Sequence, residues 1–272
     1  MAVSLEIQDG NPWWLSPDIW TVPGPDPEGA PGSPIAGQPC YLWARVHNNG
    51  ETAVQNASVR FYWANPAVGF DRTTANPVGT AFVTLSGGQQ ADVLCLAPWV
   101  PVFVNGGHEC VLAEAFHPSL DPLPGSPAFN VPTDRHVAQR NLSVVMAAKG
   151  MFHLAFEVHN PSRRARAFSL SIQEGKLDEL KPLLATLGPT FKPPERQGRL
   201  GRLGFVRDAC PAPDDLKDQQ PRIDKLELRP GERAGFSLVG QLEGPGALVH
   251  VLQQADEQTV GGLSVLVRAE GE

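Results

Sequence analysis

Apolar and polar residues alternate along much of the chain, and one alternating stretch occurs twice. The apolar positions are Cys40, Leu42, Ala44 and Val46 in the first copy and Phe152, Leu154, Phe156 and Val158 in the second. An apolar residue at every second position predicts a β-strand with one buried face. Both copies end in the triplet Val-His-Asn, at residues 46–48 and 158–160.

The two triplets lie 112 residues apart, which is close to the length of one small domain. A motif repeated at such an offset is typical of tandem modules. We therefore expect an all-β fold of two tandem immunoglobulin-like antiparallel β-sandwiches. Residues 1–147 are expected to form the first, with an N-terminal arm, and residues 148–272 the second.

Alternation and turn residues also predict the other strands. In the first module these are 57–63, 80–85, 90–96, 110–116 and 137–146, with Ala57, Val59, Phe61 and Trp63 facing the core; in the second they are 168–172, 203–207, 225–228, 234–238, 247–252 and 263–267. Asn, Gly and Pro between these segments favour tight turns. We expect the last two strands to form a hairpin through Gly261-Gly262.

The second module departs from this plan after Gly175. Leucines at 177, 180, 184 and 187 share one face at helical spacing, which predicts a short amphipathic helix over 176–187, weakened by Pro182. Residues 189–222 are rich in Pro, Gly and Arg and predict a long loop containing one strand. We therefore expect an insertion over about 175–222.

The strand that ends in Val-His-Asn-Asn-Gly, followed by a short polar stretch and the strand Val-Arg-Phe-Tyr-Trp at 59–63, resembles bacterial CARDB-like modules. The resemblance is clearest over residues 35–145 and more diffuse over 150–270. It implies an immunoglobulin-like sandwich of the kind found in surface and secreted proteins, with roles in adhesion, spacing or accessory binding. It implies no catalytic residues.

Charge narrows the range of partners. Of the net charge of −7, all the excess acidity lies in residues 1–142, which hold 12 Asp and Glu against 5 Arg, while the remainder holds 17 of each sign. A nucleic-acid partner requires a basic face, so we expect none. No apolar run reaches the length of a membrane span, and no signal peptide is visible, which favours cytoplasmic synthesis.

The four cysteines, at 40, 95, 110 and 210, lack metal-ligand spacing, and we expect neither a metal nor another cofactor. Cys40 and Cys110 fall in the two strands that antibody-type sandwiches bridge by a disulfide. The alternative is that they are small buried thiols, and the missing signal peptide favours this second interpretation.

The sequence lacks the common motifs of catalytic sites. The chain has no Gly-x-Ser-x-Gly elbow and no phosphate-binding Gly-rich loop. His47 and His159 occupy equivalent repeat positions, which indicates a shared structural role. His117 and His136 flank a Pro-rich loop with Asp121 and Asp134 between them, where solvated side chains are favoured over a cation site. We therefore expect no catalytic residues.

Two groups of residues are candidates for binding a protein partner. Trp13, Trp14 and Trp20 cluster in the N-terminal arm, either as anchors for a partner or as a cap on the first sandwich. The second group is arginine-rich, and it is either a basic patch for an acidic partner surface or a solvated turn and loop. Its members are Arg163, Arg164, Arg166, Arg199 and Arg202.

These observations favour a non-catalytic structural or protein-interaction component of a larger surface, secretion or phage-like assembly. The first alternative is a carbohydrate- or polymer-binding accessory module, for which a glycan would bind an exposed row of Tyr41, Trp43 and Tyr62. A hydrolase with its site in residues 175–222 is the least favoured alternative, because no nucleophile, base and orienting group cluster in the sequence.

Overall fold

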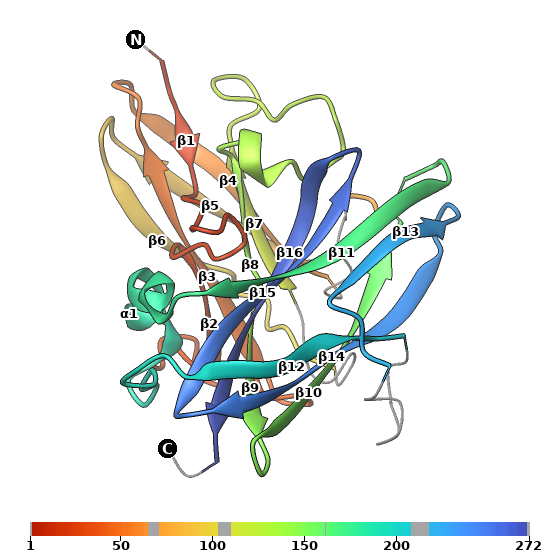
Figure 1. The fold of residues 1–272 in the computed structure, drawn as a ribbon. Helices are drawn as coiled ribbons and strands as arrows, with labels where there is room; N and C mark the ends of the chain where they lie inside the picture. Colours follow the sequence, from red (N-terminus) through yellow and green to blue (C-terminus); the bar gives the residue numbers. More distant parts are fainter. Residues whose placement is uncertain (1, 65–70, 103–109, 161, 208–217, 271–272) are drawn as a thin grey trace.

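The computed structural model describes residues 2–64, 71–102, 110–160, 162–207 and 218–270. Its regular structure is almost entirely β, which confirms the all-β part of the expected fold. The strands form four sheets, two built from residues before Asn141 and two from residues after it. The chain termini lie at opposite ends of the molecule (Figure 1).

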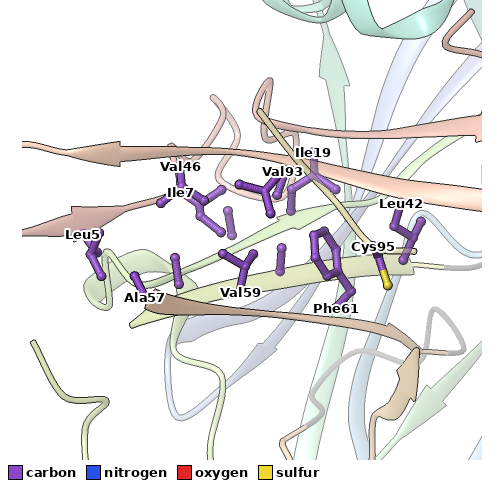
Figure 2. Packing of buried hydrophobic residues seen from close by; sticks show 14 of the residues in the cluster. Leu5, Ile7, Ile19, Leu42, Val46, Ala57, Val59, Phe61, Val93 and Cys95 are labelled. Atoms are coloured by element: carbon purple, nitrogen blue, oxygen red, sulfur yellow. The ribbon is translucent and has the colours of Figure 1, made fainter. Parts of the chain in front are cut away.

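The first half contains two antiparallel sheets. One sheet comprises β1 (Leu5–Glu6), β2 (Ile19–Pro23), β3 (Cys40–Asn48) and β6 (Gln90–Leu94), with β3 at its centre. The other has the order β5 (Asn76–Leu85), β4 (Val54–Ala64), β7 (Cys110–Phe116) and β8 (Val137–Arg140). Figure 2 shows the apolar side chains of both sheets meeting in the space between them.

The alternation predicted for β3 is confirmed, because its four apolar positions are fully buried and its other side chains up to His47 are half-buried. In β4, Ala57, Val59 and Phe61 are buried as expected. Trp63 packs against the same core but is only partly buried, and its neighbour Tyr62 is buried on the opposite face. A register shift against β5 occurs between Phe61 and Tyr62.

The second half also contains two sheets. The smaller has the order β10 (Met151–His159), β14 (Arg233–Glu243) and β12 (Arg199–Val206). The larger has the order β13 (Arg222–Leu228), β11 (Arg166–Gly175), β15 (Gly246–Ala255), β16 (Gln258–Ala269) and β9 (Leu142–Ala147). β9 runs parallel to β16, and the other pairs are antiparallel. A separate apolar cluster fills the space between these sheets.

The strand pairings of the first half recur in the second. β3 pairs with β6 as β10 pairs with β14, and β4 lies between β5 and β7 as β11 lies between β13 and β15. The pair β7 and β8 corresponds to β15 and β16. The repeated sequence motif therefore lies on strands with equivalent places in the two halves.

Asn48 and Asn160 make equivalent contacts at the ends of β3 and β10. Each is fully buried, and its Nδ2 donates to the carbonyl four residues later, at Thr52 and at Arg164, over 2.8 Å. Each Oδ1 accepts a backbone N–H two residues later. In each half, a buried amide side chain thus satisfies backbone N–H and carbonyl groups of the turn that follows the strand. This shared role explains why the triplet occurs in both halves.

The strand expected over 137–146 is two strands in different halves. β8 ends at Arg140 and pairs with β7, whereas β9 begins at Leu142 and pairs with β16. Asn141 lies between them, and its backbone N–H donates to the carbonyl of Trp14. Its Nδ2 donates to the carbonyl of Gly262 over 2.9 Å, so it contacts both the N-terminal arm and the second half.

The turn of the final hairpin is not where the glycines predict it. It falls at Asp256 and Glu257, which have φ of 51° and 62°, as both central residues of a type I′ turn require. Gly261 and Gly262 lie inside β16 instead. A Cβ on Gly262 would lie 2.5 Å from the Trp14 ring, so this glycine allows the close approach of an indole.

The helix expected over 176–187 is mostly of the 3₁₀ type. It comprises a 3₁₀ segment, Leu177–Leu183, and one α-helical turn, α1 (Leu184–Leu187). Side chains three residues apart coincide in a 3₁₀ helix, so Leu183 is buried in place of Leu184. No helix among the described residues is long and apolar enough to span a membrane.

Cys40 and Cys110 are buried thiols, so the disulfide considered for them does not occur in the structure. They belong to different apolar clusters, Cys40 in the core between the first two sheets and Cys110 on the outer face of β7. Burial raises the pKa of the Cys110 thiol. Cys210 lies outside the described residues.

Candidate interaction site

The N-terminal arm packs against the rest of the chain. Trp14 and Trp20 are buried and Trp13 is half-buried. Trp14 lies on Gly262 of β16, and Trp20 stacks on Trp43 with a centroid separation of 5.9 Å. The indoles of Trp14 and Trp20 therefore contact this chain itself, and they are not exposed anchors for a partner.

Trp14 begins a chain of hydrogen bonds that crosses between the halves. Its Nε1–H donates to Ser264 Oγ over 2.9 Å, and Ser264 Oγ lies 2.8 Å from Nδ1 of His250. Nε2 of His250 lies 2.8 Å from Glu179 Oε2, in the 3₁₀ helix. Ser264 can donate to Nδ1 while His250 donates from Nε2 to the carboxylate, so a neutral imidazole satisfies every member of the chain.

A serine, a histidine and a carboxylate in this order resemble a nucleophilic triad, but their environment does not suit catalysis. Ser264 is fully buried, and its oxygen accepts the indole N–H of Trp14. A nucleophile must be reachable by a substrate carbonyl. Burial lowers the pKa of His250, against the opposing effect of Glu179, which favours the neutral imidazole. The network therefore holds the arm and the two halves together.

A buried arginine makes a second connection at the same junction. Arg140, at the end of β8, donates from one guanidinium nitrogen to the carbonyl of Ile19 and to Thr186 Oγ1, each over 2.6 Å. These partners lie in β2 and α1. Burial lowers the pKa of Arg140 to about 10, so the side chain still carries its charge at neutral pH.

The candidate arginines do not form one basic patch. Arg163 and Arg164 are exposed in the turn after β10, where His159 pairs with Arg233 at the start of β14. Arg199 pairs with Glu243 at the other end of β14, about 30 Å away along an eleven-residue strand. Arg202 is exposed in β12, and Arg166 is ion-paired with Asp256 over 2.7 Å. The five arginines therefore do not lie together as one docking patch would require, which favours the alternative of a solvated turn and loop.

The aromatic row proposed for a glycan is also absent from the described surface. Tyr41 and Trp43 lie on β3, whereas Tyr62 lies on β4 in the other sheet. Tyr62 is buried against Phe129, and its hydroxyl donates to Glu114 over 2.8 Å. This burial and the hydrogen bond to Glu114 raise the pKa of Tyr62 to about 12.

Three of the four residues considered near the Pro-rich loop are not solvated, so the expectation is wrong for them, and His117 is half-exposed. Asp121, Asp134 and His136 are all buried. Nδ1 of His136 lies 2.7 Å from Asp134 Oδ1, and Asp121 accepts the backbone N–H of Leu5 over 2.7 Å. Among the described residues no group of His, Cys, Asp and Glu has the geometry of a metal site. These side chains attach the loop and the N-terminal strand to the sheet.

A cleft of about 810 Å³ lies in the predicted insertion, between the 3₁₀ helix and residues 193–197. Its described lining contains carboxylates, cations and apolar groups but no hydroxyl, thiol or imidazole. Asp178 in this lining is ion-paired with Lys181 over 3.0 Å. The cleft therefore lacks a side chain that could act as a serine, threonine or cysteine nucleophile.

The strand β5 forms an open edge of its sheet among the described residues. It pairs with β4 on one side, and no described strand pairs with its other side. Thr80, Phe82 and Thr84 are exposed on its outer face, and the exposed fraction of Phe82 is 65%. Ala81 and Val83 pack against the core. None of the ten residues of β5 is charged.

The equivalent edge of the second half differs in this respect. β13 carries Arg222, Asp224, Lys225 and Glu227 within seven residues, whereas register shifts occur in the pairing of both edge strands. Charged side chains and bulges are the usual means by which exposed edges avoid pairing with other chains. β9 is also uncharged, but it has six residues against the ten of β5.

The alternation of apolar and polar residues predicts a strand at 80–85 but does not predict that it lies at an edge. One signal was present in the sequence. Residues 73–91 contain no charged side chain, although charged residues make up 19% of the chain. Such a gap around a strand can reflect either a buried strand or an edge kept free of charge, and the order of strands in the sheet is needed to distinguish them.

Neither a family model nor a curated protein sequence matches this chain. Solved structures that match include red sea bream transglutaminase, at 10% identity over 94% of this chain and 32% of that protein, with a TM-score of 0.27. Another is the CupB6 tip adhesin of Pseudomonas aeruginosa, at 13% identity over 98% of both chains, with a TM-score of 0.25. The chain thus spans about a third of the transglutaminase, and at these scores neither match carries an argument about function.

Proposed function

We propose that this chain is a non-catalytic protein-interaction component of a larger assembly, built from two tandem immunoglobulin-like sandwiches. The shared order of strands in the two halves and the equivalent roles of Asn48 and Asn160 support the tandem arrangement. The CARDB-like resemblance of residues 35–145 supports a binding or spacing role. In this proposal the second half is rigidly joined to the first.

The observation that carries the proposal is the contrast between β5 and β13. These strands occupy the same edge in the two halves, yet β13 carries four charged side chains and β5 carries none. An uncharged open edge can accept an extended strand from another protein through main-chain hydrogen bonds, with alternate side chains giving specificity. We propose that β5 is the docking strand and that Phe82 is its main side-chain contact.

Selection of peptides from a random display library on the immobilised protein tests this function. We expect extended, largely apolar sequences to be selected, and their binding to slow amide hydrogen exchange over residues 76–85. Phe82→Lys is expected to weaken peptide binding at least tenfold, since it places a charge at the centre of the edge. Glu227→Lys, an exposed change on β13, is the matched control and is expected to leave binding unchanged.

The glycan alternative is tested on the same preparation with a glycan array. Binding of a glycan, with no peptide selected and no protection of β5, would overturn the protein-interaction proposal. Tyr41 and Trp43 would then be the first place to look for the glycan site, because they are the members of the proposed aromatic row that remain half-exposed.

A further inference from the structure

We propose that the strand that pairs with β5 is β5 of a second copy of this chain, running antiparallel about a two-fold axis through Phe82. This inference rests on the proposed docking role of β5. It names the partner as the chain itself, so that the four-stranded sheet of one copy continues into that of the other. An interface of this kind is isologous, since each copy contributes the same residues.

The side chains of β5 are self-complementary about Phe82. In an antiparallel pair centred there, Thr80 of each copy lies opposite Thr84 of the other, and the two Phe82 side chains lie opposite each other. On the inner face Ala81 lies opposite Val83. Pairs of aromatic side chains and pairs of threonines each stabilise antiparallel strands by about 0.2–1 kcal/mol relative to pairs of alanines. Such a pairing reduces the exposure that Phe82 has in the single chain.

Charge also permits the pairing. A charged side chain on the two-fold axis would face its own copy, and β5 contains no charged residue at its centre or elsewhere. On the adjacent strand, Arg60 lies opposite Thr80, but its guanidinium lies over the Phe116 ring and 3.5 Å from Glu114. The sequence of β13, by contrast, contains both signs of charge and has no palindromic centre.

Sedimentation equilibrium of the full chain measures this association directly. We expect the wild type to form a dimer, and Phe82→Lys to raise the dissociation constant at least tenfold by placing two ammonium groups opposite each other. Phe82 is exposed, so this change is not expected to unfold the protein, and circular dichroism checks that point. Glu227→Lys on β13 is the matched control and is expected to leave the dimer unchanged.

The register is tested by paired substitutions. Thr80→Lys combined with Thr84→Lys places like charges opposite each other twice and is expected to abolish the dimer. Thr80→Lys combined with Thr84→Glu places opposite charges across the same two pairs and is expected to restore it. Equal dimerisation of the two double variants would overturn the proposed register, and with it the two-fold axis through Phe82.

The outcomes separate this inference from the proposed function. A wild type that remains monomeric up to about 1 mM, yet binds display peptides at residues 76–85, would overturn self-pairing and leave β5 as a docking strand for another protein. A dimer that persists in Phe82→Lys would place the contact elsewhere and overturn the inference. A monomer that binds no peptide would overturn both.

Discussion

At the scale of single residues, Gly262 determines where Trp14 lies. The indole packs on the face of β16 at Gly262, which has no side chain. Its N–H donates to Ser264, two residues later in the same strand. A glycine inside a strand weakens that strand, because it loses more conformational entropy on folding and has no side chain to pack against its neighbours. Here the missing Cβ is what allows an aromatic ring from a distant segment to approach.

Replacing Gly262→Ala is therefore expected to destabilise the protein by about 1–3 kcal/mol, because the new methyl group would overlap the Trp14 ring. The measurement is the free energy of unfolding in denaturant. Gly125→Ala is the control, since a Cβ there meets no atom within 4 Å. In a Trp14→Ala background, Gly262→Ala is expected to cost much less; an equal cost in both backgrounds would show that the indole is not the cause.

At the scale of elements, the helical segment shows how local geometry changes which residues are buried. The leucine spacing alone predicted an α-helix with Leu180 and Leu184 on its inner face. Pro182 has no N–H to donate, and the segment instead takes three residues per turn from Leu177 to Leu183. Leu180 and Leu183 are then fully buried, and Leu184 is 37% exposed.

Two matched substitutions test this arrangement. Leu183→Ala is expected to reduce the free energy of unfolding by about 2–5 kcal/mol, as for other buried leucines. Leu184→Ala is expected to cost less than about 1 kcal/mol, because its side chain is partly in solvent and alanine favours a helix. Similar costs for the two, measured by thermal and urea unfolding, would favour the α-helical face over the 3₁₀ one.

The strands were predictable wherever one face is buried and the other is not. β3, β7 and β10 match the expected ranges closely because alternation is a local signal. The final hairpin was placed at Gly261-Gly262 because glycine favours turns, but the turn falls at Asp256-Glu257. Gly262 instead contacts Trp14 of the N-terminal arm, and a partner almost 250 residues away leaves no local pattern in the sequence.

At the scale of the whole molecule, the contacts that join the halves include the apolar cluster around Trp14 and Leu180, the hydrogen-bonded chain through His250, and Arg140. Each depends on residues far apart in sequence. The same reason explains why the candidate site could be predicted only in part. The strand at 80–85 follows from alternation, but its place at an open edge follows from the order of strands in the sheet.

The chain through His250 predicts how the stability of the whole molecule depends on pH. Burial lowers the pKa of His250 in the folded protein below the unfolded value of 6.5. Between these two values the unfolded chain holds more protons than the folded one, so acidification favours unfolding. A proton on Nδ1 would also face Ser264, whose oxygen already accepts the indole N–H of Trp14. Glu179, on the Nε2 side, opposes this effect but does not reverse it.

We therefore expect the free energy of unfolding to fall as the pH decreases below about 6.5 in the wild type, and to fall less in His250→Gln, which has no proton to gain. His153→Gln replaces an exposed histidine and is the matched control, expected to follow the wild type. Glu179→Gln is expected to steepen the fall, because the carboxylate stabilises the protonated imidazole. Urea unfolding at a series of pH values measures all four proteins. An identical pH dependence for the wild type and His250→Gln would show that the imidazole between the halves does not link proton binding to unfolding.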